Sequence, residues 1–495
     1  MTRQLPDLLA VDVGTSSLKA VLYGEDGVVL GSSTRHYSYR AEQPGWAEAN
    51  PQDWWAAFEA AVGDLHASDF ALDRLRAVAF TGQMHTAVLL DEDGQPLDPT
   101  ILWLDRRAAA ETLELTAALK LPPFQLNSTY TLPKLVWLKR NRPDVVSRVR
   151  KILWPKDYLR FRLTGDICTD LTEPGGAALL DWKHRTWASE RLAQTGLAAS
   201  VLPPIRKSTD VIGSPRREVA QRLGLAPDAA VVVGVGDVAA LISGAPPKPG
   251  RVTCSLGSSS MVFAALSDDQ QPNDPAQRLY IYPLLEPYRL FGGVSSTTGA
   301  SLVWAFENLA RGPAGRDFAQ AMSEAAAVEP GADGLCYIPY LAGERSPYWN
   351  DELRAGFYGL RLSHDWRHQL RAVMEGVAFS LRHLLDIYEE LGVPVGELAL
   401  AGGGTKTPGF CQLIADVCEK DVAIYTEEET VTRVLYALCR SALDQGDFAA
   451  SLLTTFPQPE IIRCQPDSGA AYRRGYERYR RFADFAVQEA LRAQG

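Results

Sequence analysis

The chain has 495 residues and a mass of 54.2 kDa, which is too long for one compact domain and suits two or three. Apolar residues make up 46% and charged residues 22%, so there is material for buried cores and no signature of disorder. The net charge of −10 argues against a protein whose main role is to hold a nucleic-acid backbone. It leaves room for a local pocket that binds one small phosphate compound.

The cysteines and the apolar runs indicate the cellular compartment. The 7 cysteines form no C-x-x-C pair, which is typical of a reduced cytoplasmic protein. No apolar stretch long enough for a signal peptide precedes Asp12. The longest apolar run, at 229–245, is interrupted by Asp237 and three glycines and does not predict a membrane span. We therefore expect a cytoplasmic enzyme with no nucleic-acid or membrane partner, and the sequence leaves a homodimer open.

The first elements predict the start of a sheet. Short β-rich runs at 8–13, 18–23 and 28–39 are separated by turn signals, which predicts two consecutive hairpins. Asn50 and Pro51 then open a helix with one apolar face, because they suit the N-cap and the first helical position.

A strand at 76–82 follows, and the segment from about 105 to 230 is predicted to be mostly helical. Strands followed by helices indicate an α/β layer architecture.

The second half of the chain repeats the opening arrangement. The strand-turn-strand segment LAVDVGTSSLKAVL aligns turn on turn with VTCSLGSSSMVFAA, which begins at 252. We infer an internal structural duplication, with a domain boundary near 243–250. A long helix is predicted after Ser363, and a strand at 397–401 leads through glycines into another helix.

The turn Gly14-Thr15-Ser16-Ser17 follows Asp12 at the end of the first strand. Such turns offer backbone N–H and hydroxyl donors to phosphate oxygens, and the acidic residue beside them can hold Mg²⁺ directly or through water. Taken alone, an ordinary hairpin turn explains the segment equally well. The second copy, Gly257-Ser258-Ser259-Ser260, favours a phosphate site, because two such turns can hold the phosphates of a nucleotide from opposite sides.

Four further segments carry candidate chemistry. Asp237 ends a valine-rich strand between glycines, which suits a general base, although a capping Asp is the alternative. Gln83-Met84-His85 and Trp103 with Asp105 combine polar groups with an aromatic ring, as sugar sites do, although hydrogen-bonded loop residues are the alternative. Gly402-Gly403-Gly404 allows close approach to a flat ligand or is only a loop.

These residues together resemble the FGGY carbohydrate kinase family, and within it the xylulokinase branch. The resemblance runs from about residue 8 to residue 445 in the order of the family. The segments that carry it are Asp12–Lys19, Gly82–His85, Ile101–Asp105, Thr131–Trp137, Pro155–Gly165, Asp237, Ser255–Ser259, Pro339–Pro347, Gly356–Leu360 and Gly402–Gly404.

The resemblance implies two actin-like, ribonuclease H-like α/β domains with the active site in the cleft between them. It implies transfer of the γ-phosphoryl group of ATP, with Mg²⁺, to a sugar hydroxyl. We expect an N-terminal sugar-binding domain at 1–245, a C-terminal nucleotide-binding domain at 246–445 and a helical extension at 446–495.

The resemblance also assigns roles to individual residues. Asp237 is expected to be the catalytic base, and Asp12 is expected to act with it by positioning Mg²⁺ through water. Sugar contacts are expected from Gln83, Met84, His85, Trp103, Asp105 and Asp237. Nucleotide contacts are expected from Gly14, Thr15, Ser16, Lys19, Gly257, Ser258, Gly402, Gly403, Gly404 and Thr407.

Three readings of the function stay open at this point. D-xylulose is the expected sugar, because the Gln-Met-His segment and the run after Pro155 resemble the xylulokinase branch most closely. Another substrate of the same family, such as gluconate, ribulose or glycerol, is the nearest alternative. A non-catalytic protein that binds a sugar or nucleotide on the same fold is the third.

Overall fold

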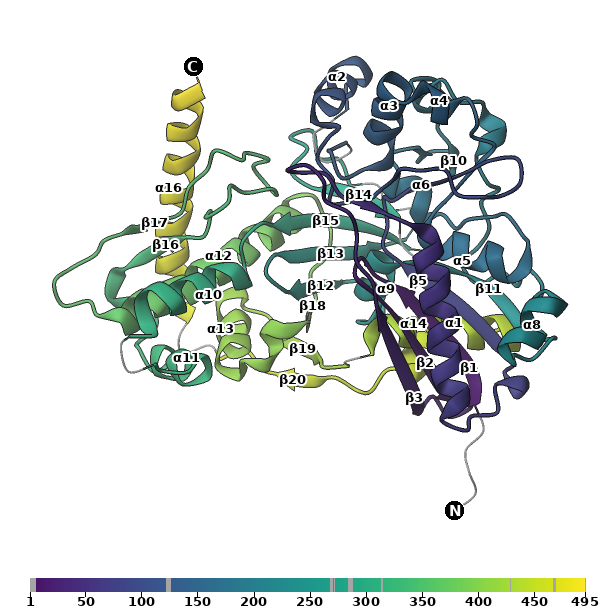
Figure 1. Cartoon of the computed structure of the whole chain (residues 1–495). Helices are drawn as coiled ribbons and strands as arrows, with labels where there is room; N and C mark the ends of the chain where they lie inside the picture. Colours follow the sequence, from purple (N-terminus) through teal and green to yellow (C-terminus); the bar gives the residue numbers. More distant parts are fainter. Residues whose placement is uncertain are drawn as a thin grey trace. The chain divides into compact units, whose positions relative to one another are not determined.

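The structure is a computed structural model that describes residues 6–121, 126–267, 270, 272–283, 288–312, 315–427, 429–465 and 469–494. The chain forms two compact units. Unit 1 contains Met1–Pro246, Tyr282–Pro287 and Glu427–Phe456, and unit 2 contains Pro247–Ile281, Tyr288–Thr426 and Pro457–Gly495. Figure 1 labels most elements of both units.

Unit 1 is built on a five-stranded sheet in the order β11-β5-β1-β2-β3. The strands β1 (Pro6–Val13), β2 (Ser17–Gly24) and β3 (Val29–His36) run antiparallel, which confirms the two predicted hairpins. The strands β5 (Ala77–Gly82) and β11 (Ala230–Gly236) lie parallel to β1. The carboxyl ends of three adjacent parallel strands therefore share one edge of this sheet.

Helices cover both faces of the unit 1 sheet (Figure 1). The helix α1 (Pro51–Ala67) begins as predicted, because the side chain of Asn50 accepts the Gln52 N–H at 3.1 Å. It packs beside α5 (Pro155–Thr164) over a core that includes Val11 and Trp54. On the other face, α14 (Thr430–Asp444) packs beside α9 (Asp237–Ser243), and the rings of Tyr436 and Tyr23 lie 5.1 Å apart.

The part of unit 1 between residues 105 and 230 is mostly helices and loops, as predicted. It has its own apolar core, which contains Leu132, Leu135 and Trp154. Its helices, other than α5, are α2 (Ala109–Leu119), α3 (Thr131–Asn141), α4 (Pro143–Val146), α6 (Thr172–Gly176), α7 (Ser189–Ala193) and α8 (Arg217–Leu223).

Unit 2 repeats the sheet of unit 1. Its seven strands lie in the order β14-β15-β13-β12-β18-β19-β20. The strands β15 (Arg289–Ser295), β13 (Ser260–Leu266) and β12 (Arg251–Leu256) are antiparallel, and β18 (Glu397–Ala401) and β19 (Val422–Tyr425) continue parallel to β12. This order and these directions match β3-β2-β1-β5-β11, which confirms the predicted duplication.

A long helix, α12 (Trp366–Glu390), lies at the centre of unit 2. The side chain of Asp365 caps it by accepting the Arg367 N–H at 3.0 Å. The other helices of the unit are α10 (Gly299–Ala305), α11 (Phe318–Ala326), α13 (Pro408–Cys418) and α16 (Gly469–Gln494).

The strands and the α-helix not yet named are short. They are β4 (Glu48–Ala49), β6 (Val88–Leu90), β7 (Thr100–Ile101), β8 (Lys151–Leu153), β9 (Leu180–Asp181), β10 (Thr186–Trp187), β14 (Tyr280–Pro283), β16 (Cys336–Ile338), β17 (Gly356–Tyr358), β20 (Glu460–Ile462) and α15 (Phe448–Thr455). No helix in the described part of the chain is both long and apolar enough for a membrane span.

The compact units divide the chain differently from the predicted domains near the C-terminus. The expected boundary after residue 245 lies beside the change of unit after Pro246. However, α14 and α15 belong to unit 1, and residues 457–495 belong to unit 2, so 446–495 is not a separate extension. The physical reason is the apolar face of α14, which includes Val434 and Leu438 and is buried against β1, β5 and β11.

Candidate functional site

The candidate site in unit 1 lies where β1, β5 and β11 end. Val13 on β1 pairs with Gly82 on β5, and Gly82 pairs with Gly236 on β11. Asp12 therefore lies one residue before this row, and Asp237 follows it directly. Ligands of open α/β sheets bind beyond the carboxyl ends of the parallel strands, so this edge of the sheet is where a substrate site is expected.

Two glycines, Gly234 and Gly236, determine the path of β11 just before Asp237. Gly234 has φ +81°, and a Cβ there would lie 2.0 Å from the carbonyl oxygen of Phe80. A Cβ on Gly236 would lie 2.6 Å from the sulfur of Met84. Gly234 requires glycine because of its positive φ and its backbone contact, whereas a side chain at Gly236 would need the Met84 side chain to move. With these two glycines, β11 can bulge and lie close to β5 before Asp237 begins α9.

Burial raises the proton affinity of both carboxyls of the site. Burial, followed by the charge of Asp12, raises the pKa of Asp237 to about 7. Backbone N–H groups of Val238 and Met84 oppose that rise by stabilising the charged form. Burial also raises the pKa of Asp12 to about 6, although the charge of Lys19 lowers it. A carboxylate with a pKa near neutrality suits a general base.

The turn after Asp12 is braced by side chains. The N–H of Gly14 donates to the carbonyl of Ser17 at 2.9 Å, which closes the turn. The carbonyl of Gly14 accepts bonds from the Tyr37 hydroxyl at 2.7 Å and the Gln83 amide at 3.1 Å. Ser16 lies exposed at the tip of the turn. The turn is therefore held in one shape by residues from β5 and from beyond β3.

The hydroxyl of Thr15 links this turn to the predicted sugar segments. It accepts the indole N–H of Trp103 at 2.9 Å and donates to the Gln83 side chain at 3.3 Å. Two of the predicted sugar-binding residues thus contact a predicted phosphate-binding residue. The indole ring of Trp103 remains partly exposed, with 37% of its residue surface accessible.

Lys19 has a partner that sequence reasoning missed. Its ammonium forms an ion pair with Glu429, which directly precedes α14. The Thr432 hydroxyl also contacts the Glu429 carboxylate, at 3.2 Å. The two residues of the ion pair lie 410 positions apart in the chain, so no local pattern indicates their contact.

Met84 and His85 lie against glycines. Met84 is buried, and a Cβ on Gly176 would lie 2.9 Å from its terminal methyl. His85 has φ +66°, and its Nδ1 contacts the carbonyl oxygen of Gly176. Burial lowers the pKa of His85 to about 4, so the ring is neutral near pH 7. With its proton on Nδ1, the ring presents Nε2 as an acceptor.

Asp105 lies differently from the prediction. Its side chain is completely buried, and it accepts the Ala47 N–H at 2.6 Å and pairs with Arg107 at 2.8 Å. Arg107 in turn pairs with Glu48 at 2.7 Å. Because the Asp105 carboxylate is buried and already bound to Ala47 and Arg107, it is not available for the direct sugar contact expected from the sequence. Asp105 instead fixes the segment that carries Trp103.

In unit 2, the second turn is exposed at Gly257 and Ser258. The carbonyls of these two residues accept backbone N–H groups of Gly299 and Ala300, at 2.9 and 3.1 Å. The glycine at 299 is required, because a Cβ there would lie 2.4 Å from the Gly257 carbonyl oxygen. This turn is therefore held by the first residues of α10 rather than by side chains.

The Gly402–Gly404 segment leads from β18 toward a cavity. Gly402 has φ +90°, and a Cβ on Gly404 would lie 2.7 Å from the Leu256 side chain, so both positions favour glycine. A Cβ on Gly403 would meet nothing within 4 Å. Gly403 is thus the member of the triplet with open space beside it.

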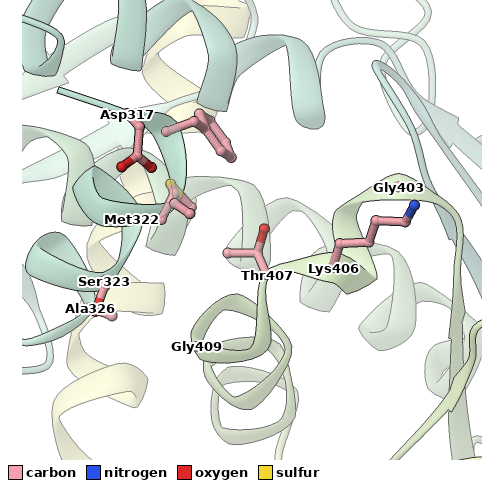
Figure 2. A pocket seen from close by; sticks show the side chains of 10 residues that line it. Asp317, Met322, Ser323, Ala326, Gly403, Lys406, Thr407 and Gly409 are labelled. Carbon is pink, nitrogen blue, oxygen red and sulfur yellow. The ribbon is translucent and has the colours of Figure 1, made fainter. Parts of the chain in front are cut away.

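The cavity has a volume of about 670 Å³ and lies within unit 2. Figure 2 shows Asp317 and Met322 on one side and Thr407 and Lys406 on the other. Its complete lining is Asp317, Phe318, Ala319, Met322, Ser323, Ala326, Gly403, Lys406, Thr407 and Gly409. Two residues of the predicted nucleotide set, Gly403 and Thr407, are among them. A largely apolar cavity with a few polar groups suits a small planar ligand.

The carboxylates of Asp12 and Asp237 suit a magnesium ion that is held partly by the protein and partly by substrate phosphates. Among the described residues there is no cluster of three or more His, Cys, Asp or Glu side chains suited to a metal. Mg²⁺ is usually bound by one or two carboxylates together with waters and substrate phosphates. Asp12 supplies hard oxygen donors of this type, and it lies near enough to Asp237 for its charge to raise the pKa of that carboxyl.

Sequence reasoning also missed a group of buried charges behind Asp237. The side chains of Lys156, Asp157, Arg160, Asp170 and Glu173 are completely buried. The run Pro155–Gly165 contributes to the family resemblance, but its charged residues carry no periodicity that would indicate burial. Only the fold shows that they contact β11.

Comparisons with known proteins identify relatives of this chain in sequence and in fold. Residues 8–244 match the N-terminal domain model, and residues 252–433 the C-terminal domain model, of the FGGY family of carbohydrate kinases. A xylulose kinase from Lactococcus lactis is 33% identical over 85% of both chains. The crystal structure titled as a xyloylose kinase from Brucella ovis has a TM-score of 0.87 and 30% identity, covering 98% of this chain and 99% of that one. A gluconokinase from Bacillus subtilis is 27% identical over 91% of this chain and 88% of its own.

Proposed function

Because the chain belongs to the FGGY family of carbohydrate kinases, it is an ATP-dependent carbohydrate kinase, and we propose that it converts D-xylulose into D-xylulose 5-phosphate. The observation that carries the proposed chemistry is the placement of Asp237 and Asp12 at the shared edge of β1, β5 and β11. The similarity to xylulose kinases supports the choice of sugar. We place the reaction in the cytoplasm, and it needs neither a nucleic acid nor a membrane.

In the proposed reaction, Asp237 orients the terminal hydroxyl of the sugar and receives its proton. A bond forms between that oxygen and the γ-phosphorus, and the bond from the γ-phosphorus to the bridging oxygen of ADP breaks. Because phosphoryl transfer has a loose transition state, the proton moves late and orientation contributes most. A pKa near 7 lets the carboxylate be ionised at the start and hold the proton afterwards.

We propose that the two turns hold the phosphates. Gly14, Thr15 and Ser16 in unit 1 and Gly257 and Ser258 in unit 2 present backbone and hydroxyl donors. Asp12 would hold Mg²⁺ through water, and the ion would neutralise charge on the phosphate oxygens. The ion pair with Glu429 orients Lys19 beside Asp12.

The proposed sugar contacts are His85, Gln83, Met84 and Trp103. The neutral His85 ring accepts a hydroxyl hydrogen at Nε2, and the exposed face of Trp103 covers the C–H face of the sugar. Asp105 acts through the segment that it fixes. The cavity beside Gly403 and Thr407 in unit 2 is the proposed site of the nucleoside.

A panel of sugars tests the proposal. ADP release is measured with ATP and Mg²⁺ for D-xylulose, D-ribulose, D-gluconate and glycerol at equal concentrations. We expect the highest kcat/KM for D-xylulose, with an acid limb that breaks near pH 7 as Asp237 is protonated. A more than tenfold preference for another substrate would replace D-xylulose in the proposal.

Gluconate is the second candidate substrate, because a gluconokinase matches over nearly the whole chain. The same panel decides between the two. Binding of a sugar in calorimetry without ADP release under any condition would instead indicate a non-catalytic binding protein.

A further inference from the structure

Behind Asp237 lies a group of four paired charges, Lys156, Asp157, Arg160 and Asp170, which we call the buried ionic cluster. The Lys156 ammonium lies 2.6 Å from the Asp157 carboxylate and 2.9 Å from that of Asp170. Arg160 lies 3.0 Å from Asp157. All four side chains have no accessible surface. None of them lies in the set that the sequence assigns to sugar, nucleotide or metal.

The cluster contacts β11 at Val233 and, through Thr172, at Gly236, which is the last residue of the strand. The guanidinium of Arg160 donates to the carbonyl of Val233. The hydroxyl of Thr172 donates to Asp170 at 2.6 Å and accepts the backbone N–H of Gly236 at 2.9 Å. Gly236 is the residue directly before Asp237, so one side-chain hydroxyl connects the cluster to the backbone that carries the proposed base.

The end of β11 needs such contacts because its pairing with β5 is irregular. The register shifts between Val232 and Val235, and Gly234 within this bulge has φ +81°. Ladder hydrogen bonds alone leave a residue at a bulge unpaired, and bulges beside active sites re-aim the side chains that follow. Here the Arg160 guanidinium donates a hydrogen bond to the Val233 carbonyl in the bulge. The Thr172 hydroxyl accepts one from the Gly236 N–H, which lies beyond the bulge.

The cost of the cluster argues that it does more than stabilise the fold. Buried ion pairs are often no more stabilising than apolar residues of the same volume, because both charges lose their water. Two cations and two anions balance in the cluster. The adjacent Glu173 carboxyl lies 3.9 Å from the Lys156 ammonium and has no hydrogen-bond partner in the described part of the chain. Burial raises its pKa well above its ordinary value, although the charge of Lys156 lowers it.

We propose that Thr172, held by the buried ionic cluster, is a positioning residue that sets the place of Asp237 relative to the sugar hydroxyl. The inference rests on the proposed role of Asp237 as the base. Without the Thr172 hydroxyl, the Gly236 N–H loses its partner and the start of α9 can shift. A misplacement of about 1 Å in such a site can lower the rate by about 100-fold.

The test compares three variants with the wild-type chain under the same ADP-release assay. Thr172→Val keeps the shape of the side chain and removes the hydroxyl, whereas Thr172→Ser keeps the hydroxyl. Thr195→Val is the matched control, because Thr195 is equally buried and its hydroxyl also accepts a backbone N–H, from Leu197 at 3.1 Å. Thr195 lies in the turn after α7 (Ser189–Ala193), and its hydroxyl donates to the carbonyl of Leu192 at 2.7 Å, so its hydrogen bonds stay within that turn.

We expect Thr172→Val to lower kcat by 10- to 100-fold with less than a threefold change in the KM for sugar. Thr172→Ser should restore kcat to within threefold of the wild-type value. Thr195→Val should lose a similar amount of thermal stability and keep its kcat. Equal kcat values for Thr172→Val and Thr195→Val would overturn the inference.

Two further outcomes keep the test decisive. If Thr172→Val does not fold, Thr172→Ala replaces it, and failure of both to fold would show a role in folding instead of positioning. If the wild-type chain phosphorylates no sugar in the panel, the proposed function fails, and that result is distinct from a failure of Thr172 to affect kcat.

Discussion

The two strand-turn-strand repeats of this chain share one backbone plan and carry different chemistry. Asp12 in the first repeat aligns with Ser255 in the second, and their strands pair in register with Thr81 and Ala401. Two residues after these partners come Gln83 in unit 1 and Gly403 in unit 2. The strand ends of unit 1 thus carry acidic and polar side chains, whereas those of unit 2 carry glycines with open space beside Gly403.

The turns differ in the same way. Side chains of Tyr37, Gln83 and Trp103 brace the first turn, whereas the backbone of α10 holds the second. A rigid turn beside two carboxylates suits a reacting phosphate and its metal, and an exposed turn in the unit that holds the cavity suits the other phosphates of a nucleotide. The comparison teaches that a duplicated scaffold fixes where ligands lie, and that a few side chains at the strand ends decide what happens there.

Among the variants that separate the two repeats, the largest effect is expected when the first repeat receives the residue of the second. Asp12→Ser removes the proposed magnesium-binding carboxylate, and we expect kcat to fall by about 100- to 1000-fold. Steady-state ADP release at saturating sugar measures it. Ser255→Ala, at the aligned position, is the comparison variant and should change kcat far less. Equal losses in the two variants would contradict the division of roles between the repeats.

A smaller effect is expected from filling the space in unit 2. Gly403→Val adds a side chain where a Cβ meets nothing within 4 Å, so the fold should tolerate it. The added methyl groups would occupy the cavity, and we expect the KM for ATP to rise by about tenfold with the KM for sugar unchanged.

Gly402→Ala provides the contrast, because φ +90° and the nearby Leu256 carbonyl make it destabilising instead. A Gly403→Val variant with an unchanged KM for ATP would remove the cavity from the proposed nucleotide site.

The smallest effect concerns stability. The pKa of Asp237 is about 7 in the folded chain against an ordinary value of 3.8, so the folded state keeps a proton that the unfolded state releases between these values. Stability therefore falls as pH rises from about 4 to about 7. We expect Asp237→Asn to be about 1 kcal/mol more stable than wild type at pH 8, since the side chain is partly exposed and solvent reduces the full penalty.

Chemical denaturation at pH 8 and pH 5 measures this difference. The gain should shrink at pH 5, where the wild-type carboxyl is mostly protonated in the folded state. A variant that is less stable than wild type at pH 8 would show that the ionised carboxylate is well accommodated.

The sequence predicts the scaffold well because local signals agree with the fold. Turn residues mark the hairpins, and Asn50 and Pro51 mark the start of α1, since capping and turn chemistry act within a few residues. The repeated Gly-Ser turn predicts the duplication for the same reason. Gln83 and Asp237 directly follow strands, Met84 and His85 come after Gln83, and Asp12 is the penultimate residue of β1. Their meeting at one edge therefore follows once the strands are parallel.

The sequence does not predict contacts between distant segments. Asp105 has the polar character of a ligand-binding residue, and only burial beside Arg107 shows that its carboxylate is already bonded. Glu429 and Thr172 reach Lys19 and Gly236 from elements far along the chain. The position of α14 in unit 1 depends on which sheet offers an apolar surface, which no local pattern specifies.

The most direct test of the central claim is the rate of sugar-dependent ADP release by Asp237→Asn, measured together with sugar binding by calorimetry. We expect turnover to drop by several orders of magnitude while the sugar still binds, because the amide keeps the shape of the side chain and cannot take the proton. Turnover within tenfold of the wild-type rate would show that another group receives the proton and would contradict the role assigned to Asp237.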